Sequence, residues 1–227
     1  MAVTLTWYGH ATMGLDVDGV RVLIDPFFSG NPSTTVDPAG LEAAFILVSH
    51  GHGDHLGDTL AIAQRTGATV VANTEISGWL RRQGVEVHAQ HIGGGHQHPF
   101  GYLKLTAALH GSGLPDGSYG GNPAGFLLTT PAGGVIYFAC DTGLFGDMRM
   151  IGDEGVDLAV LPIGDNYTMG PEDALRAIHL IRPKHVIPIH YNTWELIAQD
   201  PVAWAERVSR ETPATPHILQ PGDTFSL

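Results

Sequence analysis

Three histidines and two aspartates stand within ten residues in the stretch SHGHGDHLGD, residues 49–58. Imidazole nitrogens and carboxylate oxygens are the protein ligands that divalent transition-metal ions prefer. Side chains two residues apart just past a strand can share a side, so His50 and His52 could hold one ion together. Asp54 and His55 would then turn toward a neighbouring position. The spacing predicts metal ligands rather than a hydrophilic surface turn.

Five short apolar runs along the chain each end on a histidine or an aspartate. The runs are RVLID, FILVSH, LKLTAALH, VIYFACD and HVIPIH, and they end on Asp25, His50, His110, Asp141 and His190. Rigid sheets aim side chains at strand ends, where the loops leave room for a ligand. One such histidine is typical of a structural role, but five endings together favour a metal site. A carboxylate has two oxygens, so Asp141 is the candidate bridge between two ions.

The apolar runs are short, rich in β-branched residues and bounded by Gly, Pro and Asp, which predicts strands rather than buried helices. A helix is predicted in PEDALRAIHLIR, residues 171–182, because Pro171 suits the first position and the acidic Glu172 and Asp173 favour the N-terminal end. Weaker helices are predicted in GDTLAIAQRTG, TEISGWLRRQG and DPVAWAERVSR. The chain is expected to form one α/β domain over residues 1–227, with two halves packed sheet to sheet that join near residues 115–125.

Composition restricts the partners. The 227 residues carry 11 Lys+Arg against 23 Asp+Glu, a formal net charge of −12, so general electrostatics would not hold a nucleic acid. A single cysteine excludes an internal disulfide and favours a reducing compartment. The N-terminal MAVTLTWYGHA is unlike a signal peptide, and no run reaches membrane-spanning length. We therefore expect a cytoplasmic protein with a small-molecule substrate and no membrane partner.

The sequence resembles the metallo-β-lactamase-fold hydrolases. HGHGDH fits their H-x-H-x-D-H signature, and the order of Asp25, His110, Asp141 and His190 fits their remaining motifs. WYGHA, ACDTGLFGDM, LPIGDNYTMGPEDA and PIHYNT are similar to a narrower family of metal-dependent hydrolases related to L-ascorbate-6-phosphate lactonase. That family usually has Gly where this chain has Cys140. The resemblance implies a four-layer αββα sandwich and a possible homo-oligomer.

The resemblance also implies a ligand set for two divalent ions. The first ion would be held by His50, His52 and His110, the second by Asp54, His55 and His190, with Asp141 bridging them. Asp25 would orient the histidines without binding metal. Imidazole-rich sites suit zinc, although mixed His/Asp sets also take manganese or iron.

Two ions about 4 Å apart can share a water and lower its pKa toward neutrality, which gives a bridging hydroxide for attack on a carbonyl or phosphoryl centre. Asp54 could orient this nucleophile and move its proton. His10 could bind the substrate or the leaving group, or it could simply cap the end of a strand. Asn166 and Asn192 also follow strands, and either lines the pocket or orders its own loop.

The predicted function is a dinuclear metal-dependent hydrolase for a small ester, lactone or phosphorylated metabolite. The alternatives are a nuclease or phosphodiesterase of the same fold and a metal-stabilised binding protein without turnover. An iron redox enzyme is disfavoured, because the related di-iron oxidoreductases place Glu where this chain has His52.

Other reactive side chains are expected to be structural. His91, His96 and His98, in HIGGGHQH, are predicted to belong to a solvated hairpin that turns at the glycines. Cys140 is predicted to lie in the core rather than act as a nucleophile. Trp194 is predicted to be an ordinary core or interface anchor.

Overall fold

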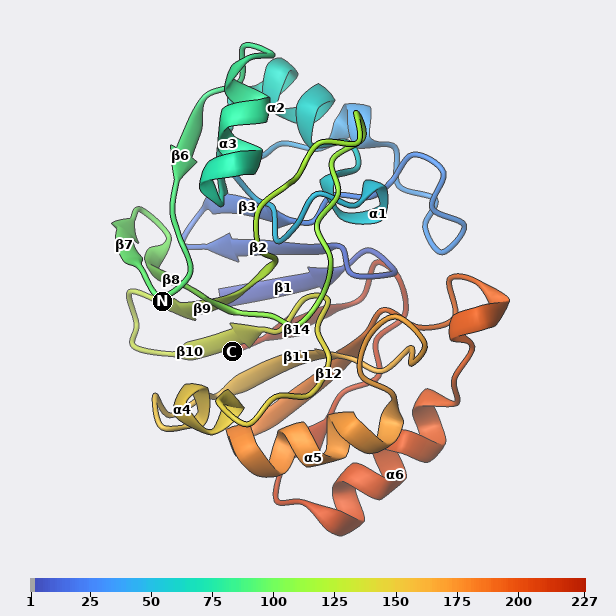
Figure 1. Cartoon of the computed structure of the whole chain (residues 1–227). Helices are drawn as coiled ribbons and strands as arrows, with labels where there is room; N and C mark the ends of the chain where they lie inside the picture. Colours follow the sequence, from blue (N-terminus) through green and yellow to red (C-terminus); the bar gives the residue numbers. More distant parts are fainter. Residues whose placement is uncertain (1–2) are drawn as a thin grey trace.

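Two seven-stranded sheets face one another between outer layers of helices, in a computed structural model that describes residues 3–227 (Figure 1). The first sheet has the order β14-β1-β2-β3-β4-β5-β6 and the second the order β13-β12-β11-β10-β9-β8-β7. Helices α2 and α3 cover the first sheet, and α4, α5 and α6 cover the second (Figure 1). The predicted four-layer αββα sandwich is confirmed.

The elements have the following bounds. The first sheet comprises β1 (Val3–Trp7), β2 (Met13–Val17), β3 (Val20–Ile24), β4 (Phe45–Leu47), β5 (Thr69–Ala72), β6 (Val87–Ala89) and β14 (Thr224–Ser226). The second comprises β7 (Gly95–His98), β8 (Gly101–Ala107), β9 (Ala124–Thr129), β10 (Val135–Phe138), β11 (Leu158–Pro162), β12 (His185–Ile189) and β13 (Thr215–Pro216). The helices are α1 (Gly53–Leu56), α2 (Thr59–Thr66), α3 (Thr74–Arg81), α4 (Met148–Gly152), α5 (Pro171–Ile181) and α6 (Pro201–Glu211). Pro38–Gly40 and Glu195–Ile197 form short 3₁₀ helices.

The two sheets repeat one pattern of strand pairing. In the first, β1, β2 and β3 are antiparallel neighbours, and β3 to β6 run parallel. In the second, β8, β9 and β10 are antiparallel, and β10 to β12 run parallel. Parallel strands end at the same edge of a sheet, so the loops after β3, β4, β10 and β12 gather at one edge of the sandwich.

The chain passes from the first sheet to the second between β6 and β7, at residues 90–94. The predicted join near residues 115–125 does not match, because that segment lies in the loop between β8 and β9, which pair within the second sheet. This loop is long and rich in glycine, which gives it the composition of a linker. It carries His110 to the edge where the other strand ends gather.

Helix α5 forms where the sequence predicts it. Pro171 opens it, Glu172 and Asp173 lie in its first turn, and Arg182 closes it with a left-handed φ of 57°. Its apolar stripe is fully covered, and the buried members are Ala174, Leu175, Ala177, Ile178 and Ile181. Burying a large aliphatic side chain stabilises a fold by about 1.5–3 kcal/mol. The stripe therefore anchors α5 against the second sheet.

The main core fills the space between the sheets and continues beneath α4, α5 and α6, and a second cluster lies beneath α2 and α3. The main core joins side chains of the two sheets, such as Leu5 and Met13 from one and Phe126 and Tyr137 from the other. This packing holds the strand ends of both halves in a fixed relation. Among residues 3–227, no helix combines the length and apolar character needed to cross a bilayer.

Candidate metal centre

Strained backbone marks the strand ends where the candidate ligands lie. His10, Asp25, Cys140 and His190 have φ values of 51°, 46°, 53° and 55°, in the left-handed region. This conformation costs a non-glycine residue roughly 1–2 kcal/mol. Such strain persists where surrounding packing fixes it, and it concentrates at functional sites. At Cys140 a glycine would adopt this φ without strain.

The first ligand group contains His50, His52 and His110. One ligand nitrogen of each lies within 4.8 Å of the others. The Nε2 atom of His50 and the Nδ1 atom of His52 are 3.1 Å apart. Two nitrogens bound tetrahedrally at about 2.0–2.1 Å from zinc would be roughly 3.4 Å apart. The spacing therefore suits two ligands of one ion.

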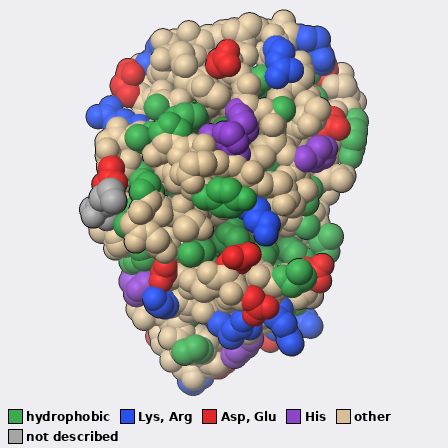
Figure 2. Space-filling model, turned by 90° about the vertical axis from the view of Figure 1, so that its left-hand side faces the viewer, with side chains coloured by type: hydrophobic (Ala, Val, Ile, Leu, Met, Phe, Trp, Pro, Cys, Tyr) green, Lys and Arg blue, Asp and Glu red, His purple; other side chains and the backbone are tan. Residues whose placement is uncertain are grey.

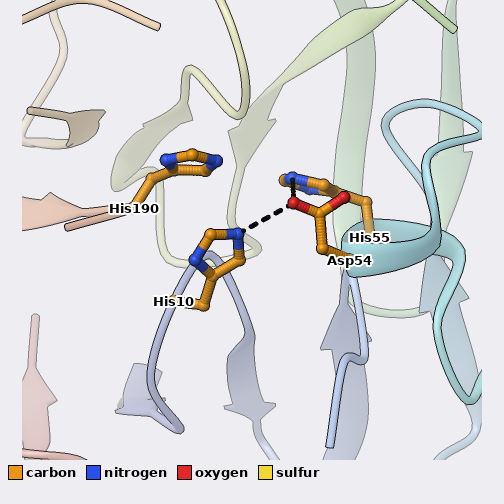
Figure 3. Close-up of side chains that lie close together, drawn as sticks. All are labelled: His10, Asp54, His55 and His190. Carbon is orange, nitrogen blue, oxygen red and sulfur yellow. Dashed lines mark hydrogen bonds and ion pairs between the residues drawn. The ribbon is translucent and has the colours of Figure 1, made fainter. Parts of the chain in front are cut away.

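The second group contains Asp54 and His55 from α1, His190 from the end of β12, and His10 from the loop after β1. Their ligand atoms also lie within 4.8 Å of one another, and Figure 3 shows the four side chains converging. The His10 Nε2 atom is 3.2 Å from Asp54 Oδ2. The structure thus brings together the three residues expected at a second ion and adds His10 beside them.

Asp141 lies between the two groups. Its Oδ2 atom is 3.2 Å from His55 Nε2, 3.1 Å from His190 Nε2 and 3.5 Å from His110 Nε2. Burial alone would raise the pKa of this carboxyl, but His190 and His55 hold it well below its usual value. Within residues 3–227, Asp141 Oδ1 and His55 Nε2 are buried without a hydrogen-bond partner. Buried polar atoms rarely stay unpaired, so the donor set fits metal ions.

Asp25 is fully buried behind the histidines and accepts three hydrogen bonds. They come from the Ser49 backbone N–H at 2.8 Å, the Ser49 hydroxyl at 2.6 Å and His55 Nδ1 at 2.8 Å. The Ser49 oxygen is in turn 2.9 Å from His50 Nδ1. In the neutral rings these contacts place the proton on Nδ1, so each Nε2 atom is the one free to bind a metal ion. Asp25 therefore has the geometry of an orienting residue.

The pKa values of His55 and His10 shift in opposite directions. Burial alone would lower the pKa of His55, but the carboxylates of Asp141 and Asp25 raise it well above 6.5. For His10, burial prevails over Asp54 and lowers the pKa to about 4. Burial would raise the pKa of Asp54, but the hydrogen bond from His10 and the charge of His55 keep it low. Asp54 is therefore an ionised acceptor beside a neutral His10.

Comparisons with known proteins identify the family. The family model described as a beta-lactamase superfamily domain matches residues 20–191. A UPF0173 metal-dependent hydrolase from Heliobacterium modesticaldum is 47% identical over 98% of this chain and 97% of its own. One from Desulforamulus reducens is 49% identical over 98% of this chain and 99% of its own. The chain belongs to this family of metal-dependent hydrolases.

A solved structure agrees with this assignment. Igni18, described as a novel metallo hydrolase from the archaeon Ignicoccus hospitalis, is 34% identical and superposes with a TM-score of 0.91 over 100% of this chain and 99% of its own. The predicted metallo-β-lactamase fold and metal-dependent hydrolase class are confirmed. The number of ions, their identity, the oligomeric state and the roles of single residues stay predictions.

The hydrolase has a cavity of about 330 Å³ in front of the ligand groups. It is lined by His52, Asp54, His110, Asp141, Tyr167, His190 and Trp194. The sequence prediction missed Tyr167 and Trp194, which are 54% and 41% exposed. Trp194 lies edge-on to the His10 ring at 5.0 Å, so it forms part of the cavity wall rather than a core anchor.

Of the two roles left open for Asn166 and Asn192, lining the pocket or ordering a loop, the structure shows neither side chain in the lining of the cavity. Asn192 is exposed, and its side chain accepts a hydrogen bond of 2.7 Å from the Gln199 backbone, so it orders its own loop. Asn166 is also exposed and does not line the cavity. Both have left-handed φ values, 57° and 50°. Tyr167 follows Asn166 directly, and Trp194 lies two residues after Asn192.

The histidines of HIGGGHQH form no simple hairpin at the glycines. The segment joins β6 and β7, which belong to different sheets, so the predicted turn is a crossover. His91 and His96 are exposed, as expected for solvated positions, but His98 is only 6% exposed. Cys140 is buried, and burial with the nearby carboxylates of Asp25 and Asp141 raises its pKa well above 9. This agrees with a core cysteine.

Proposed function

We propose that the hydrolase uses a pair of divalent ions, zinc before manganese or iron, to cleave a small carboxylic ester or lactone. The observation that carries this proposal is the position of Asp141. One of its oxygens lies 3.1–3.5 Å from nitrogens of His110 in the first group and of His55 and His190 in the second. A carboxylate shared by two ligand groups supports a bridged pair rather than one isolated ion.

Two divalent ions, when bound, would lower the pKa of a shared water toward neutrality and polarise the bond under attack. Asp54 faces the cavity and accepts the proton of the attacking water at a carboxylate oxygen. The His10 Nε2–H group donates to Asp54 Oδ2 at 3.2 Å, and the Thr193 hydroxyl, 2.8 Å away, donates to His10 Nδ1. This chain of hydrogen bonds fixes the Asp54 carboxylate. His10 is fully buried and positions Asp54 rather than touching the substrate.

The lining of the cavity favours an uncharged substrate. Among residues 3–227, those lining the cavity include no lysine or arginine, which are the side chains that usually bind phosphate. Tyr167 and Trp194 instead offer aromatic surface to an apolar group. The net charge of −12 opposes a nucleic acid. An ester or lactone therefore fits better than a phosphorylated metabolite or a phosphodiester.

The test is a substrate panel with the purified, zinc- or manganese-loaded protein. Lactones and carboxylic esters should be hydrolysed faster than phosphomonoesters, phosphodiesters or RNA. His52→Ala should lower kcat/KM roughly 10³-fold, because the loss of an ion removes several kcal/mol of transition-state stabilisation. His91→Ala, which changes an exposed histidine outside the centre, should leave turnover unchanged. Equal activity of the two variants would contradict the proposal.

A further inference from the structure

A further group of three histidines, separate from both ligand groups of the metal centre, lies at the opposite side of the sandwich from α1. His88 belongs to β6, and His96 and His98 belong to β7 (Figure 1). One ligand nitrogen of each lies within 4.8 Å of the others. The ring centroids are 4.3 Å apart for His88–His96, 4.9 Å for His88–His98 and 4.8 Å for His96–His98. The group is as closely gathered as the ligand sets of the metal centre.

Two edge strands bring these rings together. β6 is the last strand of the first sheet, and β7 is the last strand of the second. His96 and His98 are two residues apart in a strand and therefore share a face. Figure 2 views the molecule from the side where β6 and β7 lie, and histidine side chains gather on the upper half of that face. The group therefore spans the seam between the sheets.

His98 is held in one orientation. Its ring stacks on Phe100 at 5.0 Å with an angle of 6°, and it contacts the edge of Phe45 at 5.8 Å. Its Nε2 atom is 3.4 Å from Gln90 Oε1. The Gln90 amide nitrogen donates to the Gly94 and Leu103 carbonyls at 3.0 and 2.7 Å, so its oxygen must accept. His98 then carries its proton on Nε2 and keeps a free lone pair on Nδ1.

This arrangement resembles the support that proteins give to metal ligands. A ligating histidine usually donates its other N–H to a fixed acceptor, which sets the ring and its tautomer. Burial and the neighbouring His88 and His96 lower the pKa of His98 to about 4, so the ring is neutral at pH 7. His96 is exposed, which leaves one side of the group open to water.

We propose that His88, His96 and His98 bind one divalent transition-metal ion, zinc by preference, at a site separate from the metal centre. Three imidazoles with one water complete a tetrahedral zinc site. The ion would link β6 to β7 and so hold the open edges of the two sheets together. We call this site, formed by His88, His96 and His98, the histidine clasp. A ligand that binds only the folded state stabilises it, so zinc at this site raises the melting temperature.

Counting bound zinc after equilibrium dialysis tests the site. The wild-type protein should bind three ions per chain, two at the centre and one at the clasp. His96→Ala and His88→Ala should each bind one ion fewer, keep the wild-type circular dichroism spectrum and keep turnover. His91→Ala is the matched control, because it removes an exposed histidine of the same segment that lies outside the group. It should bind as many ions as the wild type.

Melting curves give a second readout. Zinc should raise the melting temperature of the wild type and of His91→Ala more than that of His96→Ala. Equal zinc content in His96→Ala, His88→Ala and wild type would overturn the proposal, as would an equal loss in His91→Ala. His52→Ala separates the two sites, because it removes an ion from the centre and should leave the clasp ion in place.

Discussion

Asp25→Asn tests how the centre sets the tautomers of its histidines. Asparagine has nearly the same shape and tolerates the left-handed φ of 46° at this position. Its oxygen can still accept from the Ser49 backbone N–H. Its NH₂ group replaces the oxygen that accepts from His55 Nδ1 at 2.8 Å and from the Ser49 hydroxyl at 2.6 Å. His55 must then accept at Nδ1 and carry its proton on Nε2, the atom that faces Asp141.

The expected loss follows from the hydrogen bond that is broken. A hydrogen bond to a charged group contributes about 1.5–3 kcal/mol. Since 1.36 kcal/mol is a factor of ten, metal affinity should fall about 10- to 150-fold. The fold should persist, because asparagine has the size of Asp25 and its oxygen can keep the hydrogen bond from the Ser49 backbone N–H.

Competition with a chromophoric chelator measures this loss. Asp58→Asn is the matched control, because Asp58 Oδ2 accepts only from the Phe28 and Ser29 backbone N–H groups, at 2.8 and 2.9 Å, and an amide oxygen can do the same. Asp58→Asn should keep wild-type affinity. If Asp25→Asn binds metal as tightly as Asp58→Asn, the reasoning about tautomers is refuted.

Two further predictions concern Cys140 and pH. The buried, protonated thiol of Cys140 should resist a thiol reagent in the native protein, and one cysteine per chain should react after unfolding. Labelling of the native protein that abolishes turnover would instead indicate a nucleophilic role for Cys140. His98, facing His88 and His96, has a pKa of about 4 in the folded chain against 6.5 unfolded, so its stabilising effect is present above pH 6.5 and is lost as the pH falls toward 4. Urea denaturation of zinc-free protein should therefore show lower stability at pH 5 than at pH 7, and His98→Leu should show a shallower pH dependence.

The sequence predicts which polar side chains come together, because their signals are local. Each of Asp25, His50, Asp141 and His190 ends an apolar run, and the ends of parallel strands meet at one edge of a sheet. The H-x-H-x-D-H spacing places three more polar side chains, His52, Asp54 and His55, on the loop and short helix that follow β4. These rules need no knowledge of how the two halves pack. They predict which residues meet, and the structure brings them together.

The aromatic wall of the cavity and the histidine clasp depend on information that the sequence lacks. Tyr167 and Trp194 line the cavity from the loops that follow β11 and β12, and no residue spacing determines the paths of these loops. His88 meets His96 only because the outer edges of two separate sheets lie together. Neither a strand pattern nor a residue spacing determines the packing of unpaired edges.

Buried charge explains why we expect two ions rather than one. Asp25 and Asp141 are 0% and 2% exposed, and Asp54 lies beside them. Three carboxylates in so small a region repel one another strongly in a medium of low dielectric constant. The raised pKa of His55 between Asp141 and Asp25 shows that this region attracts positive charge. When His55 is a neutral ligand, a single divalent ion leaves one negative charge uncompensated, whereas two ions compensate all three and leave a net positive charge to attract the developing oxyanion of an ester.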